Sequence, residues 1–230
     1  MSGTRNVITR NRGTATAGNI IVVLDSQSNA WSIDISNAAN LWQSYPATTG
    51  GIDMIAVGDT SGNNTGWRLF GLKKPNPSLY WHRPLSDHSS PWIQGNHGFA
   101  DSPREMTSIS FGGSSDQFVF GVLTDGNYAV THFPSGDWWK NWHADMGPQK
   151  PTPIMQLVTC ASMNYALDAN GVVFSQTLWP PGVSQWRRLT QPGGQTVQLV
   201  AASKSYVWAY TAQGQLWNMH SGDSTGAWIG

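Results

Sequence analysis

The sequence predicts an all-β fold made of one repeated element, and three observations lead to this prediction. Tryptophans recur near the ends of five nearly equal segments, at Trp42, Trp92, Trp142, Trp186 and Trp228. The chain contains 25 glycines and 13 prolines, which favour turns over helix interiors. Only 11% of the residues are charged, so the Glu and Lys density of amphipathic helices is missing.

Each repeat has the same internal order. It opens with a strand of small or β-branched residues, predicted at 14–17, 52–57, 107–111, 154–160 and 197–202. An apolar strand, a tight polar turn and an aromatic-bearing strand follow, and the tryptophan marks a short last strand. Asp125-Gly126, Asn170-Gly171 and Gln213-Gly214 supply the positive φ of hairpin turns, because glycine has no Cβ to clash there.

Four short strands in about 40 to 50 residues are typical of one β-propeller blade. We therefore predict a single domain, residues 1–230, with five blades of four antiparallel strands; six blades are the alternative count. The small first strands suit the crowded central axis. Residues around Thr4 to Ile8 are expected to continue the segment at Trp228, which closes the ring and removes a free sheet edge.

Charge and hydropathy narrow the classes of partner. Thirteen basic and thirteen acidic residues give a net charge of zero, so we expect no nucleic-acid binding. No apolar run approaches the roughly 20 residues that span a bilayer, and the polar N-terminus does not resemble a secretory signal. Cys160 is the single cysteine and cannot form an intramolecular disulfide. Cytoplasmic synthesis is expected, with release by a non-classical route left open.

A surplus of tryptophan suggests the function. Thirteen Trp in 230 residues suit stacking on the apolar faces of sugar rings, while nearby amides and hydroxyls bind the sugar hydroxyls. Repeated weak sites would act together through multivalency. We therefore predict a non-catalytic lectin that recognises cell-surface or microbial glycans for defence or attachment.

The motifs also resemble those of a known class. Phe120-Gly121-Val122 through Asp125, with the tryptophans beyond it, resembles repeats of β-propeller lectins of the tachylectin-2-like, tectonin-like and bacterial fucose-binding kinds. Leu79-Tyr80-Trp81-His82 and Leu216-Trp217-Asn218 resemble another strand of these repeats. The resemblance covers all five repeats. It implies glycan sites between blades without a metal, often in a homo-oligomer; fucose, N-acetylglucosamine and methylated sugars are compatible ligands.

The candidate carbohydrate-binding residues form two groups. The first holds aromatic and polar residues of the third strand and the less regular rings: Trp31, Tyr80, Trp81, His82, Trp138, Trp139, Phe174, Trp179, Trp217 and Asn218. The second holds the five recurring tryptophans, which either bind sugar or only fill the wedge between sheets. Ala129 replaces the third-strand ring in the third repeat, so five equal sites are not expected.

Two other functions compete with the lectin. A protein-interaction scaffold would also concentrate aromatic residues. A glycoside hydrolase would need two carboxylates, but Asp25, Asp125 and Asp168 fall at hairpin turns, where Asp bonds locally. Asp53 and Asp59 are then the best remaining pair. The histidines are scattered without zinc-ligand spacing, so we predict no catalytic residue, cofactor or metal.

Overall fold

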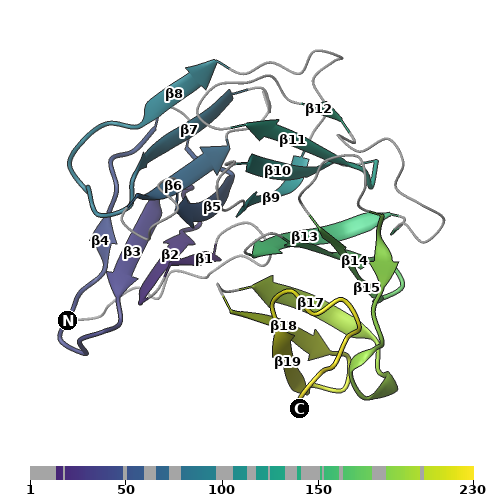
Figure 1. Ribbon diagram of the computed structural model, residues 1–230. Coiled ribbons are helices and arrows are strands. Elements are labelled where there is room, and N and C mark those ends of the chain that lie inside the picture. Colours follow the sequence, from purple (N-terminus) through teal and green to yellow (C-terminus); the bar gives the residue numbers. More distant parts are fainter. Residues whose placement is uncertain are drawn as a thin grey trace. The chain divides into compact units, whose positions relative to one another are not determined.

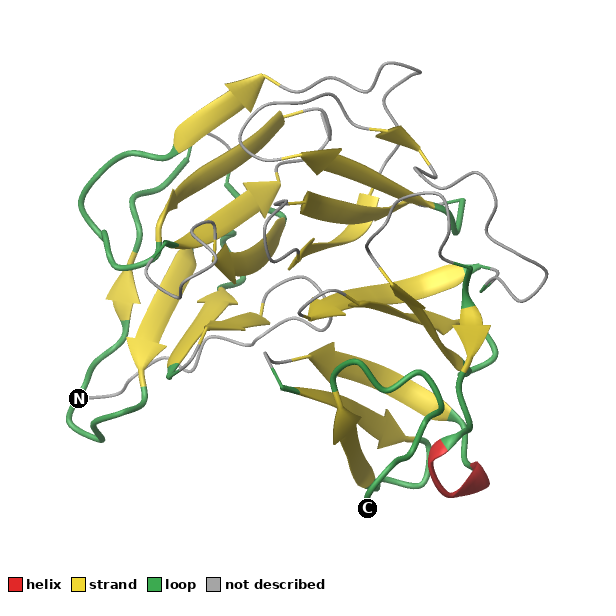
Figure 2. Cartoon of the chain, viewed as in Figure 1, coloured by secondary structure: helices red, strands yellow, loops and turns green. Residues whose placement is uncertain are grey.

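The computed structural model describes residues 14–17, 19–48, 51–59, 66–72, 79–96, 106–112, 118–123, 125–132, 139–140, 151, 153–160, 163–177, 185–202 and 205–230. The chain forms two compact units, Met1–Ser108 and Ile109–Gly230. Strands make up almost all of the regular structure in these ranges, and one 3-10 turn, η1 (Pro192–Gly194), is the helical exception (Figure 2). The prediction of an all-β chain is confirmed.

The strands form five antiparallel sheets in which neighbours follow sequence order (Figure 1). The first unit holds β1 (Thr14–Ala17), β2 (Ile20–Leu24), β3 (Ala30–Asp34) and β4 (Gln43–Ser44), then β5 (Met54–Asp59), β6 (Trp67–Leu72), β7 (Leu79–Pro84) and β8 (Ile93–Asn96). The third sheet starts at the unit boundary with β9 (Met106–Gly112), β10 (Phe118–Leu123), β11 (Tyr128–His132) and β12 (Trp139–Lys140). The fourth contains β13 (Ile154–Cys160), β14 (Met163–Asp168), β15 (Val173–Thr177) and β16 (Arg187–Arg188), and the fifth β17 (Val197–Ala202), β18 (Tyr206–Thr211) and β19 (Leu216–His220).

The fifth sheet has three strands within the described ranges. A single bridge joins Asn218 to Ile229, with N–H to C=O distances of 2.8 and 2.7 Å in the two directions. Ile229 directly follows Trp228, just as Arg187, the first residue of β16, directly follows Trp186. Ile229 therefore occupies the position at which a fourth strand begins. The expected closing segment from Thr4 to Ile8 lies outside the described residues, and the blade count of five and the ring closure stay predictions.

Local hydrogen bonding fixes the hairpins as the sequence indicates. Gly126 and Gly171 have φ of +78° and +74°, the left-handed region that glycine enters without a Cβ clash. Asp168 Oδ1 accepts the N–H groups of Asn170 and Val172, both at 2.9 Å. Asp25 and Asp125 accept backbone N–H groups of their own turns in the same way. The interpretation of these carboxylates as turn residues is confirmed.

Consecutive sheets within each unit are joined by one recurring hydrogen bond. A carbonyl in the central hairpin turn of one sheet accepts the N–H that leads into the next sheet's first strand. In the second unit Gly126 accepts from Ile154 and Gly171 from Val197, both at 2.9 Å, and in the first unit Ser28 accepts from Ile52 at 3.0 Å. Because these bonds satisfy backbone groups at buried turns, they fix the register between sheets.

The burial of a sheet's second strand depends on how many faces of that sheet are packed against another sheet. All six residues of β14 are buried, since one face meets the third sheet and the other meets the fifth. In β18, Val207 and Ala209 are buried against the fourth sheet, but Tyr206 and Tyr210 on the opposite face are exposed. The fifth sheet therefore has only one face packed against a described sheet of its own unit.

Candidate functional site

Two of the recurring tryptophans anchor a sheet to the one before it. Trp92 Nε1 donates to the carbonyl of Pro46 at 2.9 Å, and Trp228 Nε1 donates to that of Thr190 at 2.7 Å. Each acceptor lies four residues beyond the tryptophan of the preceding repeat. These contacts support the interpretation of the recurring rings as packing residues.

The other recurring tryptophans differ in burial. Trp186 is 2% exposed and meets the Tyr128 ring edge-on, with centroids 6.2 Å apart. Trp42, in the first sheet, is 46% exposed. Trp142 lies outside the described residues. The same repeat position is thus buried in the fourth sheet and exposed in the first.

The predicted third-strand residues have unequal environments. Trp31 is half-buried and donates its Nε1 to Asp25 Oδ2 at 2.9 Å. Phe174 is 7% exposed within the core between the third and fourth sheets, so the structure does not present it for stacking on a ligand. Trp217 is half-buried and packs so closely that a Cβ on Gly193 would lie 2.8 Å from its ring. Asn218 uses its backbone to pair with Ile229.

The structure does not describe the side chains of the remaining candidates. Tyr80, Trp81 and His82 lie on β7, and Trp139 on β12, but their side chains fall outside the described part. Trp138 and Trp179 lie wholly outside it. Among the candidates whose side chains the structure describes, Trp31, Phe174 and Trp217 lie on three different sheets, and the glycan site stays a prediction.

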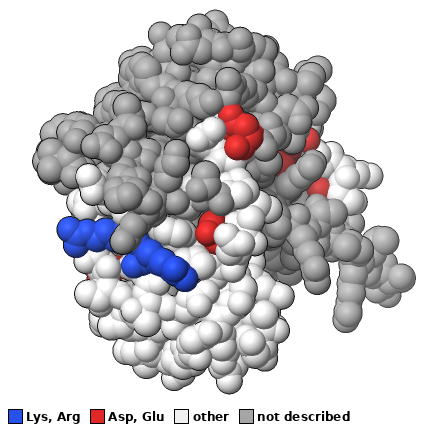
Figure 3. Space-filling model, turned by 90° about the vertical axis from the view of Figure 1, so that its right-hand side faces the viewer, with Lys and Arg blue, Asp and Glu red and all other residues white. Residues whose placement is uncertain are grey.

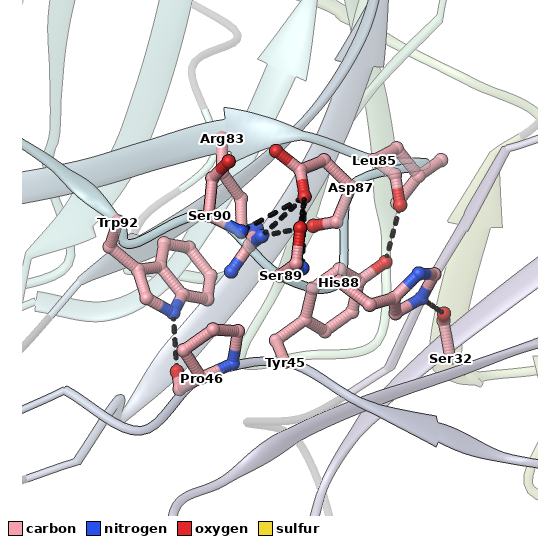
Figure 4. A network of polar contacts seen from close by, with 10 residues as sticks. All are labelled: Ser32, Tyr45, Pro46, Arg83, Leu85, Asp87, His88, Ser89, Ser90 and Trp92. Atoms are coloured by element: carbon pink, nitrogen blue, oxygen red, sulfur yellow. Dashed lines mark hydrogen bonds and ion pairs between the residues drawn. The ribbon is translucent and has the colours of Figure 1, made fainter.

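A buried arginine fills the junction between the first and second sheets (Figure 4). Arg83 has no exposed surface, and its guanidinium lies 5.0 Å from the Tyr45 ring centroid and 5.7 Å from that of Trp92. Its Nη2 bonds the backbone oxygen of Asp87 and lies 3.5 Å from Asp87 Oδ1. Paired aromatic faces are a favourable environment for this cation.

A loop histidine completes this cluster and bonds the first sheet (Figure 4). His88 stacks on Tyr45 with centroids 4.5 Å apart, and its Nε2 lies 2.7 Å from Ser32 Oγ. The Tyr45 hydroxyl donates to the Leu85 carbonyl at 2.7 Å. Burial, and then the nearby Arg83 charge, hold the pKa of His88 below its ordinary value. Tyr45 and Trp92 are both buried, so the protein's own side chains fill the centre of this cluster.

The structure also shows a repeated turn that the sequence analysis missed. Asp87 and Asp223 each lie five residues before a recurring tryptophan. Their Oδ1 atoms accept the N–H two residues on, from Ser89 at 2.9 Å and from Thr225 at 2.7 Å. Asn37 makes the same bond with Ala39, five residues before Trp42. The fixed spacing of Asn or Asp before Trp was the available signal, and it marks a structural turn.

The side of the fifth sheet that faces away from the fourth sheet carries a row of apolar side chains. The strand register places Leu199, Tyr210 and Leu216 side by side across β17, β18 and β19, and they are 42%, 43% and 58% exposed. Trp208 and Tyr206 follow on β18, with ring centroids 6.1 Å apart. We call this surface the open face; it consists of Leu199, Tyr206, Trp208, Tyr210, Leu216 and Ile229.

Charge and metal-binding groups do not define a site in the described ranges. Among the described residues visible in Figure 3, uncharged ones predominate, the basic side chains lie together in one place, and the acidic ones are scattered. Among the residues that the structure describes, no cluster of three or more His, Cys, Asp or Glu is arranged to hold a metal. The same ranges contain no helix that is long and apolar enough to cross a membrane.

Comparisons with known proteins identify the fold alone. Neither a scan against protein-family models nor a search of curated proteins finds a match. Human WBSCR16 superposes with a TM-score of 0.56 at 12% identity, over 90% of this chain and 61% of that one. YCF48 bound to D1 peptide superposes with a TM-score of 0.55 at 13% identity, over 95% of this chain and 65% of that one. Yeast RCC1 (Prp20) bound to Kap60 superposes with a TM-score of 0.53 at 12% identity, over 89% of this chain and 54% of that one.

These similarities support a propeller-type fold, because the neighbours are β-propeller-type structures. They do not support a lectin of the tachylectin kind. The chain spans less than two thirds of the length of each of these three proteins.

Proposed function

We propose that this chain is a non-catalytic β-propeller that binds another protein, and that the open face is its binding surface. The observation that carries the proposal is the ladder of Leu199, Tyr210 and Leu216, three exposed apolar side chains in lateral register. Single exposed apolar residues are ordinary, whereas a contiguous patch marks an interaction surface. Tyrosine adds a hydroxyl at the edge of its apolar ring, which suits a surface that is alternately wet and covered.

The chemistry of the face indicates the kind of partner. None of its six residues is charged, so electrostatic recognition of an acidic or basic segment is not favoured. Aromatic residues are enriched at the centres of protein interfaces, where charged residues are depleted. The expected partner segment therefore carries aliphatic side chains and few charges at the contact.

The structural neighbours are consistent with this choice among the competing functions. Prp20 is described with Kap60, Gsp1p and histones, and YCF48 with a D1 peptide. These partners belong to those proteins, but they show that propellers of this general type bind polypeptides. This favours the scaffold alternative over the lectin.

Lectin activity, predicted from the sequence, is the competing function, and a glycan array separates the two. Side chains of the protein itself fill the junction around Tyr45 and Trp92, and Phe174 is buried. We expect no binding on a glycan array, with or without a chelator. Strong, chelator-resistant binding to one family of terminal sugars would contradict the protein-binding proposal.

A direct test places a photo-crosslinking amino acid at position 216 and, as a matched control, at Gln213, an exposed turn residue of the same sheet. A partner identified through position 216 is then purified and titrated with the wild type, Leu216→Lys and Gln213→Lys. We expect Leu216→Lys to weaken binding at least about tenfold, as for a central interface residue, and Gln213→Lys to leave it unchanged. Equal binding by all three proteins would exclude the open face.

A further inference from the structure

We propose that mild acid releases residues 86–91 from the first sheet, because protonation of His88 places a second positive charge beside the buried guanidinium of Arg83. These residues form the loop between β7 and β8, and we call them the His88 loop. All of the groups involved belong to the first two sheets, so the release does not depend on the open face. Its consequence is local exposure of the Tyr45 ring, on which His88 stacks.

The two ends of the His88 loop are anchored, whereas its middle lies at the surface. Leu85, which precedes the loop, is 2% exposed, and Trp92, which follows it, is 8% exposed. Within the loop, four of the six residues are exposed, and Asp87 and His88 are half-buried. A segment with few buried side chains can open locally while the core around it stays folded.

His88 attaches the middle of this loop to the first sheet. Its ring stacks on Tyr45 with centroids 4.5 Å apart, and its Nε2 lies 2.7 Å from Ser32 Oγ, a hydroxyl that does not titrate. Tyr45 is buried, and His88 covers one face of its ring (Figure 4). Loss of these contacts would therefore expose an aromatic ring that is buried in this structure.

The charges around His88 oppose its protonation while the loop is attached. Among the described residues, the charged groups that act on it are Arg83 of β7 and Asp87 of its own loop, and the titratable group of the first sheet is the Tyr45 phenol, whose pKa is raised by burial. Burial, and then Arg83, outweigh Asp87 and the Ser86 carbonyl, and hold the pKa of His88 below its ordinary value. The guanidinium lies 5.0 Å from the Tyr45 ring centroid, so both cations would lie against one ring.

The fifth sheet builds the equivalent junction without a charge at this position. Met219 lies nine residues before Trp228, as Arg83 lies nine residues before Trp92. Met219 is 0% exposed and belongs to the core, so an apolar side chain is sufficient to fill this position of the repeat. Apolar residues often replace buried ionic groups without loss of stability. Packing alone therefore does not require Arg83.

The equivalent loop of the fifth sheet, residues 222–227, is an internal control. Ser224 stands at the position of His88, four residues before the tryptophan. Asp223 caps its turn as the corresponding Asp of the His88 loop does. One backbone N–H of this control loop donates to the Tyr165 hydroxyl at 2.9 Å, and Tyr165 is 0% exposed. Each loop thus contacts one buried tyrosine, but only one of the loops carries a histidine.

The release has a defined pH range. Above the unfolded pKa of about 6.5, His88 is neutral in both states and the loop stays attached. Because the open loop binds one proton more, its population rises by up to about tenfold per pH unit below that value, until the pKa of folded His88 is reached. Asp87 does not titrate in this range, since hydrogen bonds from Ser90 and Ser89 hold its pKa far below its ordinary value.

Hydroxyl-radical footprinting across about pH 5 to 8 tests the proposal, with the oxidation of Tyr45 and Tyr165 measured by mass spectrometry. We expect the oxidation rate of Tyr45 to rise as pH falls below about 6.5, while Tyr165 stays protected at every pH. Unchanged circular dichroism shows that the protein stays folded over this range. A parallel rise of both tyrosines, or protection of both at every pH, overturns the proposal.

Two variants separate protonation from the charge that opposes it. His88→Gln keeps a neutral hydrogen-bonding side chain, so the oxidation of Tyr45 should no longer vary with pH. Arg83→Met carries the residue of the fifth sheet and should show a smaller rise, because His88 is then more easily protonated in the attached loop. A pH response in His88→Gln equal to that of the wild type overturns the proposal, and this comparison is decisive even if Arg83→Met does not fold.

Discussion

Gly171 tests the account of how sheets are joined, because alanine there adds one methyl group at a junction between two sheets. The new Cβ would lie 2.1 Å from Thr196 Cγ2 and 2.8 Å from the backbone oxygen of Val197. Gly171 also has φ of +74°, and its carbonyl accepts the Val197 N–H that begins the fifth sheet. The strand following the turn must therefore move.

The expected cost has three parts. A non-glycine residue in the left-handed region costs about 1 to 2 kcal/mol, overpacking adds about 1 to 3 kcal/mol, and weakening the Val197 bond adds about 1 kcal/mol. The sum is about 3 to 6 kcal/mol. For a chain of this size, about 2 to 4 °C of melting temperature is lost per kcal/mol, so we expect a decrease of at least about 6 °C.

Gly214→Ala is the matched control. Gly214 has φ of +81° in the equivalent turn of the fifth sheet, but the nearest atom to its added Cβ is the Tyr210 hydroxyl at 3.6 Å. Only the conformational cost of about 1 to 2 kcal/mol applies there. Tryptophan fluorescence during thermal unfolding compares the two variants. Equal losses would refute the conclusion that the Gly171 turn is locked against the next sheet.

Three further predictions address the junction between the first and second sheets. The pKa of folded His88 is lowered by burial and by Arg83, so neutral His88 stabilises the fold fully above the unfolded pKa of about 6.5. This stabilisation is lost as pH falls through and below that value. The melting temperature of the wild type should therefore fall more than that of His88→Gln in this pH range, and identical pH profiles would contradict this. Trp92→Phe loses the hydrogen bond to Pro46 and should lower the free energy of unfolding by about 1 kcal/mol beyond the effect of the smaller ring. Trp186→Phe is the control, because Trp186 Nε1 has no hydrogen-bond partner in the described structure. Denaturant titration compares the two variants. Arg83→Met should destabilise the protein less than Arg83→Ala, because methionine keeps apolar contact with the Tyr45 and Trp92 rings without a buried charge; the reverse order in denaturant titration would show that the guanidinium itself is required.

Local chemistry made much of the fold predictable from sequence. The predicted first strands at 14–17, 154–160 and 197–202 coincide with β1, β13 and β17. The glycines of Asp125-Gly126 and Asn170-Gly171 adopt the positive φ that their turns require. These features depend on a few neighbouring residues, so a single sequence is sufficient to find them.

The environment of each face is not a local property, and the repeat pattern does not determine it. Leu167 and Tyr210 occupy equivalent positions in apolar strands, yet one is buried by the next sheet and the other is exposed. Trp31 and Phe174 share a repeat position as well, but only Phe174 lies in a core. The periodicity that reveals a repeat makes its members look alike, and it does not indicate which of their residues are buried.

Arg83 shows the same limit for polar residues. A basic residue beside His82 and Pro84 has the appearance of surface in the sequence. Its burial depends on Tyr45, which comes from another sheet, and on Trp92, which follows the next loop. No pattern within one repeat indicates this aromatic environment.

Hydroxyl-radical footprinting of the dilute wild-type protein, read by mass spectrometry, tests the central claim most directly. The account predicts rapid oxidation of Tyr210 and Leu216 on the open face, and protection of Met219, which is buried on the opposite face of the same sheet. Slow oxidation of Tyr210 and Leu216 at a concentration where the protein sediments as a monomer would contradict the existence of the open face.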